Sequence, residues 1–265
     1  MTSPLSSAGI QLEGRVAIVT GGSRGIGAGI ARMLLAQGAE VAICGRNAPE
    51  ELPEAEGRRA RFWPCDVRDA EAVAGFVDAV GAALGRIDIL VNNAGGAPAA
   101  EAATVSPRFH EKIMALNLMA PIHMSQAVHR WMMRNEGGGS IVNIASVSAT
   151  RPSPGTAVYG AAKAGLLGLT RSLAAEWGPR IRVNAIVVGL VDSGGDALPY
   201  GGVAARDAIA ASLPAGRLGA PDDIAAATLY LSSDMAAYVS GAALEVHGGG
   251  ERPLFLDLVE RHAQG

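Results

Sequence analysis

Short apolar runs alternate with longer stretches of helical periodicity along most of the chain. Each apolar run is rich in β-branched residues or bounded by turn residues, which is typical of buried strands. Seven runs fit this pattern, at residues 15–20, 40–46, 60–67, 87–95, 139–147, 181–189 and 243–246. Continuous apolar runs of this kind are typical of parallel strands that are covered on both faces.

Helical patterns separate these strands. We predict helices after the glycine-rich turn at 21–27, after Asp69, and over residues 107–134, 157–178 and 222–232. Gly38 suits the end of the first helix, and Pro107 suits the first turn of another. Alternating strands and helices imply parallel β-α-β units. We therefore predict one α/β domain over residues 1–265, a doubly wound Rossmann-type fold with a seven-stranded parallel sheet flanked by helices.

Residues 190–220 interrupt the alternation. The segment is rich in glycine and proline and looks irregular, and long insertions of this kind in compact domains are often lids. Apolar residues in it indicate an apolar pocket, namely Leu190, Leu198, Tyr200 and Leu213. Asp192 and Asp196 either face solvent or bind a polar group of the substrate.

Composition narrows the classes of function. The 265 residues carry a net charge of −3, without the basic excess of a nucleic-acid-binding protein. No run of about 18 uncharged apolar residues predicts a membrane span, and the first residues lack the pattern of a signal peptide, so we expect a cytoplasmic protein. Cys44 and Cys65 are expected to be buried, reduced thiols, with a paired or catalytic role as the alternative. We predict no metal site.

The segment Thr20-Gly21-Gly22-Ser23-Arg24-Gly25-Ile26-Gly27 joins the first strand to the first helix. Glycines allow a tight turn and a close approach of the backbone to a pyrophosphate, and the helix start offers free N–H groups. A structural turn would show similar spacing, but this one lies where the phosphate-binding mechanism requires it.

Tyr159 and Lys163 lie four residues apart on a predicted helix and so share one face. A nearby ammonium would lower the pKa of the tyrosine and make it usable as a general acid or base. A surface tyrosine with an incidental lysine is the alternative.

Three motifs together resemble the short-chain dehydrogenase/reductase family: TGGSRGIG at 20–27, NNAG at 92–95 and the spacing of Tyr159 and Lys163. The resemblance covers about residues 14–249 and is to the single-domain branch, with members such as 3-oxoacyl-[acyl-carrier-protein] reductases. It implies four catalytic residues. Ser146, thirteen residues before Tyr159, would stabilise the substrate oxygen, and Asn117 would hold a water that links Lys163 to solvent.

The same resemblance implies a nicotinamide dinucleotide cofactor. Its implied contacts are Gly21, Ser23, Arg24, Gly25, Ile26, Gly27, Arg46, Asp66, Val67, Asn93, Ala94, Gly95, Tyr159, Lys163, Gly189, Val191 and Ser193. Gly45 stands where NAD-dependent members place an aspartate, whereas Arg24 and Arg46 suit a 2′-phosphate. We therefore expect NADP(H) to be preferred, with NAD(H) possible. Asp66 and Val67 would contact the adenine edge, unless Asp66 only stabilises a helix start.

The chain departs from the family pattern in three places. Val188 stands where the family usually has proline, and Ser193 where it commonly has threonine. His247 replaces the aspartate of a V-D-G-G motif, and we expect a structural role for it. The tail after residue 250 has an apolar stripe at Leu254, Phe255 and Leu258 that could pack on a neighbouring subunit or cap a substrate site.

The leading functional hypothesis is NADPH-dependent reduction of an apolar ketone such as a 3-oxoacyl thioester. The alternatives are oxidation of a secondary alcohol or steroid and a catalytically silent regulator that binds NADP. Small residues at 161, 165, 168 and 172 lie away from Tyr159, and they either pack on the sheet of their own subunit or let two helices approach closely. Because family members commonly assemble through this helix and residues 107–134, we expect a homotetramer.

Overall fold

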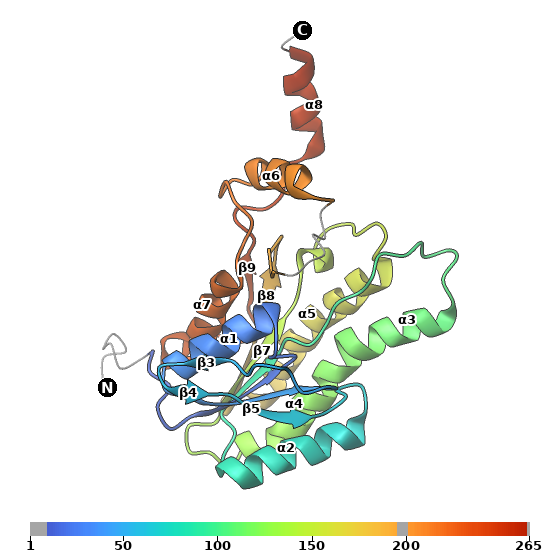
Figure 1. Ribbon diagram of the computed structural model, residues 1–265. Helices are drawn as coiled ribbons and strands as arrows, with labels where there is room; N and C mark the ends of the chain where they lie inside the picture. Colours follow the sequence, from blue (N-terminus) through green and yellow to red (C-terminus); the bar gives the residue numbers. More distant parts are fainter. Residues whose placement is uncertain (1–9, 195–200, 264–265) are drawn as a thin grey trace.

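A seven-stranded parallel sheet forms the centre of the molecule (Figure 1) in the computed structural model, which describes residues 10–194 and 201–263. The strand order is β5-β2-β1-β6-β7-β8-β9. The strands are β1 (Val16–Thr20), β2 (Glu40–Gly45), β5 (Arg61–Pro64), β6 (Ile89–Asn92), β7 (Gly139–Ile144), β8 (Ile181–Val188) and β9 (Ala243–Val246). This arrangement confirms the predicted doubly wound parallel sheet.

Helices α1 (Gly25–Ala36) and α7 (Pro221–Ser232) pack on one face of the sheet, and α2 (Ala70–Leu84), α4 (Ala120–Met132) and α5 (Ala157–Trp177) pack on the other. The other described helices are α3 (Pro107–Met114), α6 (Val203–Ser212) and α8 (Leu254–Ala263). A π-helical turn, η2 (Ala115–Met119), joins α3 to α4, and two short 3₁₀ turns are η3 (Val147–Ala149) and η4 (Asp234–Ala236). The predicted helix at 107–134 is thus continuous but has one wide turn.

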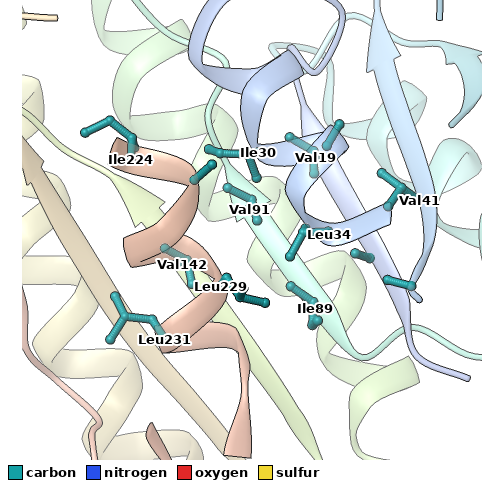
Figure 2. Packing of buried hydrophobic residues seen from close by; sticks show 14 of the residues in the cluster. Val19, Ile30, Leu34, Val41, Ile89, Val91, Val142, Ile224, Leu229 and Leu231 are labelled. Carbon is teal, nitrogen blue, oxygen red and sulfur yellow. The ribbon is translucent and has the colours of Figure 1, made fainter. Parts of the chain in front are cut away.

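Side chains of the strands alternate between two hydrophobic clusters, as the pleat requires. Ala17 and Val19 of β1 pack with α1 and α7 on one face, whereas Val16 and Ile18 pack with α2 and α4 on the other. Figure 2 shows the first cluster, where Ile30 of α1 approaches strand side chains such as Val91. Because β1 is buried on both faces, its first four residues form a continuous apolar run, and Thr20 at its end is also buried.

A buried polar network ties the second face together. The side-chain amide of Asn92 donates to Asn143 Oδ1 (2.8 Å) and to Ser125 Oγ (3.2 Å), and Asn143 donates to Thr170 Oγ1 (2.9 Å). These bonds join β6, β7, α4 and α5. Buried polar groups with partners of this kind fix one arrangement of the elements around them.

Several elements differ from the sequence-based prediction. Strands β5, β6 and β7 end three residues earlier than predicted, so the residues after them form loops. The segment at 190–220 contains a helix, α6, and a bridge between Val191 and Gly219. A small hairpin, β3 (Glu54–Ala55) and β4 (Arg58–Arg59), was not predicted. The lid residues Asp196, Leu198 and Tyr200 lie outside the described residues.

The tail forms α8, which extends beyond α6 and away from the sheet (Figure 1). Its large apolar side chains are 37–69% exposed, and they are Leu254, Phe255, Leu256, Leu258 and Val259. In the described part of the chain, no helix is long and apolar enough to cross a membrane. Cys44 and Cys65 are free, buried and hydrogen-bonded to each other.

Candidate active site

The glycine-rich turn joins β1 to the start of α1. Gly21 and Gly25 have φ values of 62° and 52°, in the left-handed region that suits glycine. A Cβ on Gly27 would lie 2.3 Å from the Gly21 carbonyl oxygen, so only glycine allows this close approach. Helix α1 begins after Arg24 without a side-chain cap. Its first N–H groups are therefore available to an anion, as a bound pyrophosphate requires.

The loop after β6 is fastened to this turn. The backbone N–H groups of Asn93 and Ala94 donate to Thr20 Oγ1 (3.0 and 2.9 Å). The Asn93 side-chain amide donates to the carbonyls of Thr20 (2.9 Å) and Gly21 (3.2 Å). The side chain of Asn93 thus shapes the glycine turn through the backbone, and Ala94 and Gly95 border the same crevice.

Residues after β8 form the opposite wall. The Gly189 N–H donates to the Val246 carbonyl (3.0 Å), and Val191 forms its bridge with Gly219. A Cβ on Gly25 would lie 3.3 Å from Cβ of Ser193, so the hydroxyl-bearing residue 193 stands beside the phosphate turn. The uncapped helix start, the glycines and this hydroxyl fit a dinucleotide pyrophosphate.

The ends of β2 and β5 form the part of the crevice expected to hold adenosine. Arg46 is exposed, and a Cβ on Gly45 would find no atom nearer than 3.7 Å. Asp66 follows β5 and is bound by Arg68, whose Nη2 donates to Asp66 Oδ2 at 2.5 Å. This ion pair, together with the charge of Arg46, holds the pKa of Asp66 below its usual value. Sequence reasoning missed Arg68, since no motif marks it.

The predicted catalytic residues lie near one another at the carboxyl edge of the sheet. Ser146 follows β7 as the residue before η3, and its side chain lies near Tyr159 of α5. Burial raises the pKa of Tyr159, and the nearby Ser146 side chain offsets this only in part. The expected lowering of this pKa by Lys163 is therefore wrong for the protein without its cofactor. Lys163 Nζ lies 5.6 Å from the centre of the Tyr159 ring.

Lys163 is buried one helical turn further along α5. Its ammonium group donates to the Ile144 carbonyl at the end of β7 (2.7 Å). Burial lowers the pKa of Lys163 to about 8. A lysine with this pKa is mostly charged at neutral pH and can hold a ribose hydroxyl.

The wide turn between α3 and α4 holds Asn117, which is fully buried. Its side-chain amide donates to the carbonyls of Ile113 (2.9 Å) and Gly96 (3.0 Å), and its Oδ1 accepts from the Gly96 N–H (2.8 Å). The structure thus shows Asn117 holding the loop after β6 beside Lys163, since a Cβ on Gly95 would contact both side chains. Its water relay stays a prediction.

The loop that holds Ser146 packs closely on α5. A Cβ on Gly160 would lie 2.8 Å from the Ser148 carbonyl oxygen. The Ser148 N–H donates to Ser146 Oγ (3.1 Å), and Ser153 donates to Ser148 Oγ (3.0 Å). Gly160 therefore sets how near Ser146 comes to Tyr159. Sequence reasoning overlooked it, although it directly follows the tyrosine.

His247 directly follows β9. Its Nε2 lies 3.0 Å from Glu245 Oε2, and a Cβ on Gly189 would lie 2.6 Å from the Cα of His247. These contacts agree with the structural role expected for it.

Comparisons with known proteins extend these observations. A family model described as enoyl-(acyl carrier protein) reductase matches residues 21–251. D-Threitol dehydrogenase of Mycolicibacterium smegmatis is 44% identical over 90% of this chain and 94% of its own. A 3-oxoacyl-[acyl-carrier-protein] reductase of Chlamydia trachomatis is 38% identical over 90% and 98%. The crystal structure of a putative short-chain alcohol dehydrogenase from Sinorhizobium meliloti matches with a TM-score of 0.83 and 37% identity, covering 91% of this chain and 98% of that one.

Proposed function

The chain belongs to the short-chain dehydrogenase/reductase family and is an NAD(P)-dependent oxidoreductase, and on that premise we propose that it reduces the ketone of an apolar substrate with NADPH. The grouping of Ser146 and Tyr159 beside buried Lys163 carries this proposal. A 3-oxoacyl thioester is the substrate type that we favour, since one relative is named for that reaction.

The protonation state of Tyr159 is the one that the proposed reduction requires. Because burial raises its pKa, the phenol keeps its proton at neutral pH. A protonated phenol is the form that can donate to the oxygen of a ketone as it becomes an alcohol. Oxidation needs a proton transfer from the alcohol to Tyr159, and the tyrosine must then be an ionised phenolate.

The roles of the residues follow from their positions. The nicotinamide cofactor supplies the hydride when it is bound. Ser146 orients the substrate oxygen by a hydrogen bond, and Tyr159 gives it a proton. The ammonium of Lys163 holds the nicotinamide ribose next to Tyr159, and Asn117 keeps the loop after β6 in place beside both.

The preference for NADP(H) rests on charge at the ends of β1 and β2. Arg24 and Arg46 are exposed there, and Gly45 brings no carboxylate against a 2′-phosphate. Arginine can bind a phosphate through two parallel hydrogen bonds. We propose NADPH as the working cofactor, with NADH as the weaker one.

A second candidate is oxidation of a secondary alcohol such as a polyol. The observation that favours it is the 44% identity with a protein named D-threitol dehydrogenase. The lid at 190–220 would then bind hydroxyl groups, for which Asp192 would have to exchange its ion pair with Arg206 of α6.

We also propose that four copies assemble through α5 and the helix formed by α3, η2 and α4, and that the protein works in the cytoplasm. Ala161 and Ser172 of α5 are exposed, and nothing lies within 4 Å of a Cβ placed on Gly168. Small side chains of this kind let two helices pack closely.

The test is NADPH oxidation followed by absorbance with a panel of 3-oxoacyl thioesters and apolar ketones, and NADP⁺ or NAD⁺ reduction with D-threitol and apolar secondary alcohols. We expect turnover on the ketone panel and a loss of about 10²- to 10⁴-fold in kcat for Tyr159→Phe, with a far smaller change in the Kd for NADPH. Tyr238→Phe, at a fully exposed tyrosine, is the control. Wild-type turnover in Tyr159→Phe would refute the assigned role, and faster turnover of threitol than of any ketone would favour the second candidate.

A further inference from the structure

The carboxylate that the family resemblance assigns to adenine is already bound by a neighbouring side chain. Arg68 Nε donates to Asp66 Oδ1 (2.9 Å) and Oδ2 (3.2 Å), and its Nη2 donates to Oδ2 (2.5 Å). The Arg68 backbone N–H adds a fourth bond to Oδ1 (3.1 Å). Each side chain of the pair is 34% exposed, so the pair lies at the rim of the crevice.

This pair lies beside the groups expected to meet the 2′-phosphate. Strands β5, β2 and β1 are adjacent, and their ends lead to Asp66, Arg46 and the turn with Arg24. The Cys65 N–H donates to the Gly45 carbonyl (2.9 Å), which brings the two loops together. Arg46 is near enough to lower the pKa of Asp66.

Asp66 would otherwise oppose a phosphorylated cofactor. An uncompensated carboxylate next to a 2′-phosphate adds repulsion that a 2′-hydroxyl does not feel. Asp69, the next carboxylate along the chain, caps α2 by accepting from the N–H groups of Glu71 and Ala72. Asp66 has only Arg68 as a hydrogen-bonded cation among the described residues.

We propose that Arg68 determines the preference for NADPH over NADH by neutralising Asp66. The carboxylate expected to contact adenine then no longer repels the 2′-phosphate. The inference rests on the proposed use of NADPH and adds a residue to it. Arg68 acts through Asp66 and is therefore a positioning residue rather than a direct ligand. Its effect falls on the phosphorylated cofactor alone, because NADH carries no charge at the 2′ position.

The experiment uses isothermal titration of the full-length protein with 2′,5′-ADP and 5′-AMP, which report binding without turnover, and then with NADPH and NADH. In Arg68→Gln we expect affinity for 2′,5′-ADP and NADPH to fall about tenfold, with affinity for 5′-AMP and NADH unchanged or slightly higher. The loss should shrink as salt is raised, since salt screens charges at the surface. Arg61→Gln, at the other end of β5, removes the same charge from a different ion pair and should change none of the four affinities.

A second variant tests the mechanism. Asp66→Asn combined with Arg68→Gln should recover most of the lost affinity for 2′,5′-ADP, because no carboxylate is left to neutralise. No recovery would overturn neutralisation, and so would equal losses for 5′-AMP and 2′,5′-ADP in Arg68→Gln. If the wild type binds 2′,5′-ADP no better than 5′-AMP, the proposed NADPH preference fails. If the wild type prefers 2′,5′-ADP and Arg68→Gln keeps that preference, only the role of Arg68 fails.

Discussion

Burial sets the protonation of Lys163, since no nearby charge shifts its pKa. The side chain is enclosed between α5 and the end of β7, and its ammonium has the Ile144 carbonyl as a partner. A buried ammonium without a carboxylate is less stable than one in water, so its pKa falls to about 8. The same burial acts on Tyr159 in the opposite direction, because the charged form of a tyrosine is the deprotonated one.

This pKa predicts how stability depends on pH. Between about pH 8 and 10.5 the folded protein has a neutral Lys163 while the unfolded chain still binds the proton, so raising the pH favours the folded state. As the pH is raised through this range, the free energy of unfolding of the cofactor-free protein should therefore increase relative to that of Lys163→Met, by on the order of 3 kcal/mol at most. Urea unfolding of both proteins at several pH values from 7 to 10 measures the difference. Parallel pH profiles would contradict the prediction.

At the scale of elements, the site depends on how closely η3 packs against the start of α5. The Ser148 carbonyl fills the space that a side chain at position 160 would need. Hydroxyl groups of Ser148, Ser153 and Thr156 then link the loop to the helix start. The separation of Ser146 and Tyr159 is thus set by backbone contact and by these bonds.

Replacing Gly160 with alanine should damage catalysis without unfolding the protein. The added methyl group would push the Ser148 carbonyl and carry Ser146 away from Tyr159, so we expect kcat to fall at least about tenfold at an unchanged Kd for NADPH. Gly75→Ala, at an open position of α2, gives the same gain in helix propensity without a clash. Steady-state kinetics of the two variants compare them. A normal kcat in Gly160→Ala would show that the loop can shift at no cost to catalysis.

Patterns in the sequence predicted the elements that have their own periodicity. The run at 16–19 is apolar throughout because both of its faces are covered, and the four-residue spacing of Tyr159 and Lys163 required only a helix. Contacts made by loop residues left no such signal. The pairing of Arg68 with Asp66 and the approach of Gly160 to Ser148 depend on loop conformation, and α6 lies in a segment whose glycines and prolines masked its helical part.

At the scale of the whole molecule, the small residues of α5 do not all serve one purpose. A Cβ on Gly165 would lie 3.1 Å from Leu118 of η2, so this glycine allows packing within the subunit. Gly168 has open space beside it, and Ala161 and Ser172 are exposed. Packing inside the subunit therefore holds for Gly165, on η2 rather than on the sheet, and the proposed contact between subunits concerns only Ala161, Gly168 and Ser172.

Gly168→Leu tests the proposed assembly. Since no atom lies within 4 Å of a Cβ at this position, the isolated subunit tolerates the larger side chain. A helix from another copy that packs here would be pushed away, so we expect the molar mass to fall below that of four chains. Light scattering coupled to size exclusion measures the mass, and Gly75→Leu controls for a leucine on an exposed helix. A tetramer that persists in Gly168→Leu would place the interface elsewhere.

The π-helical turn at Ala115–Met119 also affects which residues before and after it share one face of the helix, because it holds one residue more than an α-helical turn. An α-helix rotates by about 100° with each residue, so the extra residue in the wide turn offsets everything after it against everything before it. Ile113 on one side and Met124, Val128 and Met132 on the other are all buried with this offset in place. Removing that extra residue would close the turn to a plain α-helix with both buried faces in place but would displace Asn117, whereas a residue added or removed on either side of the turn would rotate one buried face into water. The segment should therefore tolerate substitution better than any change in its length.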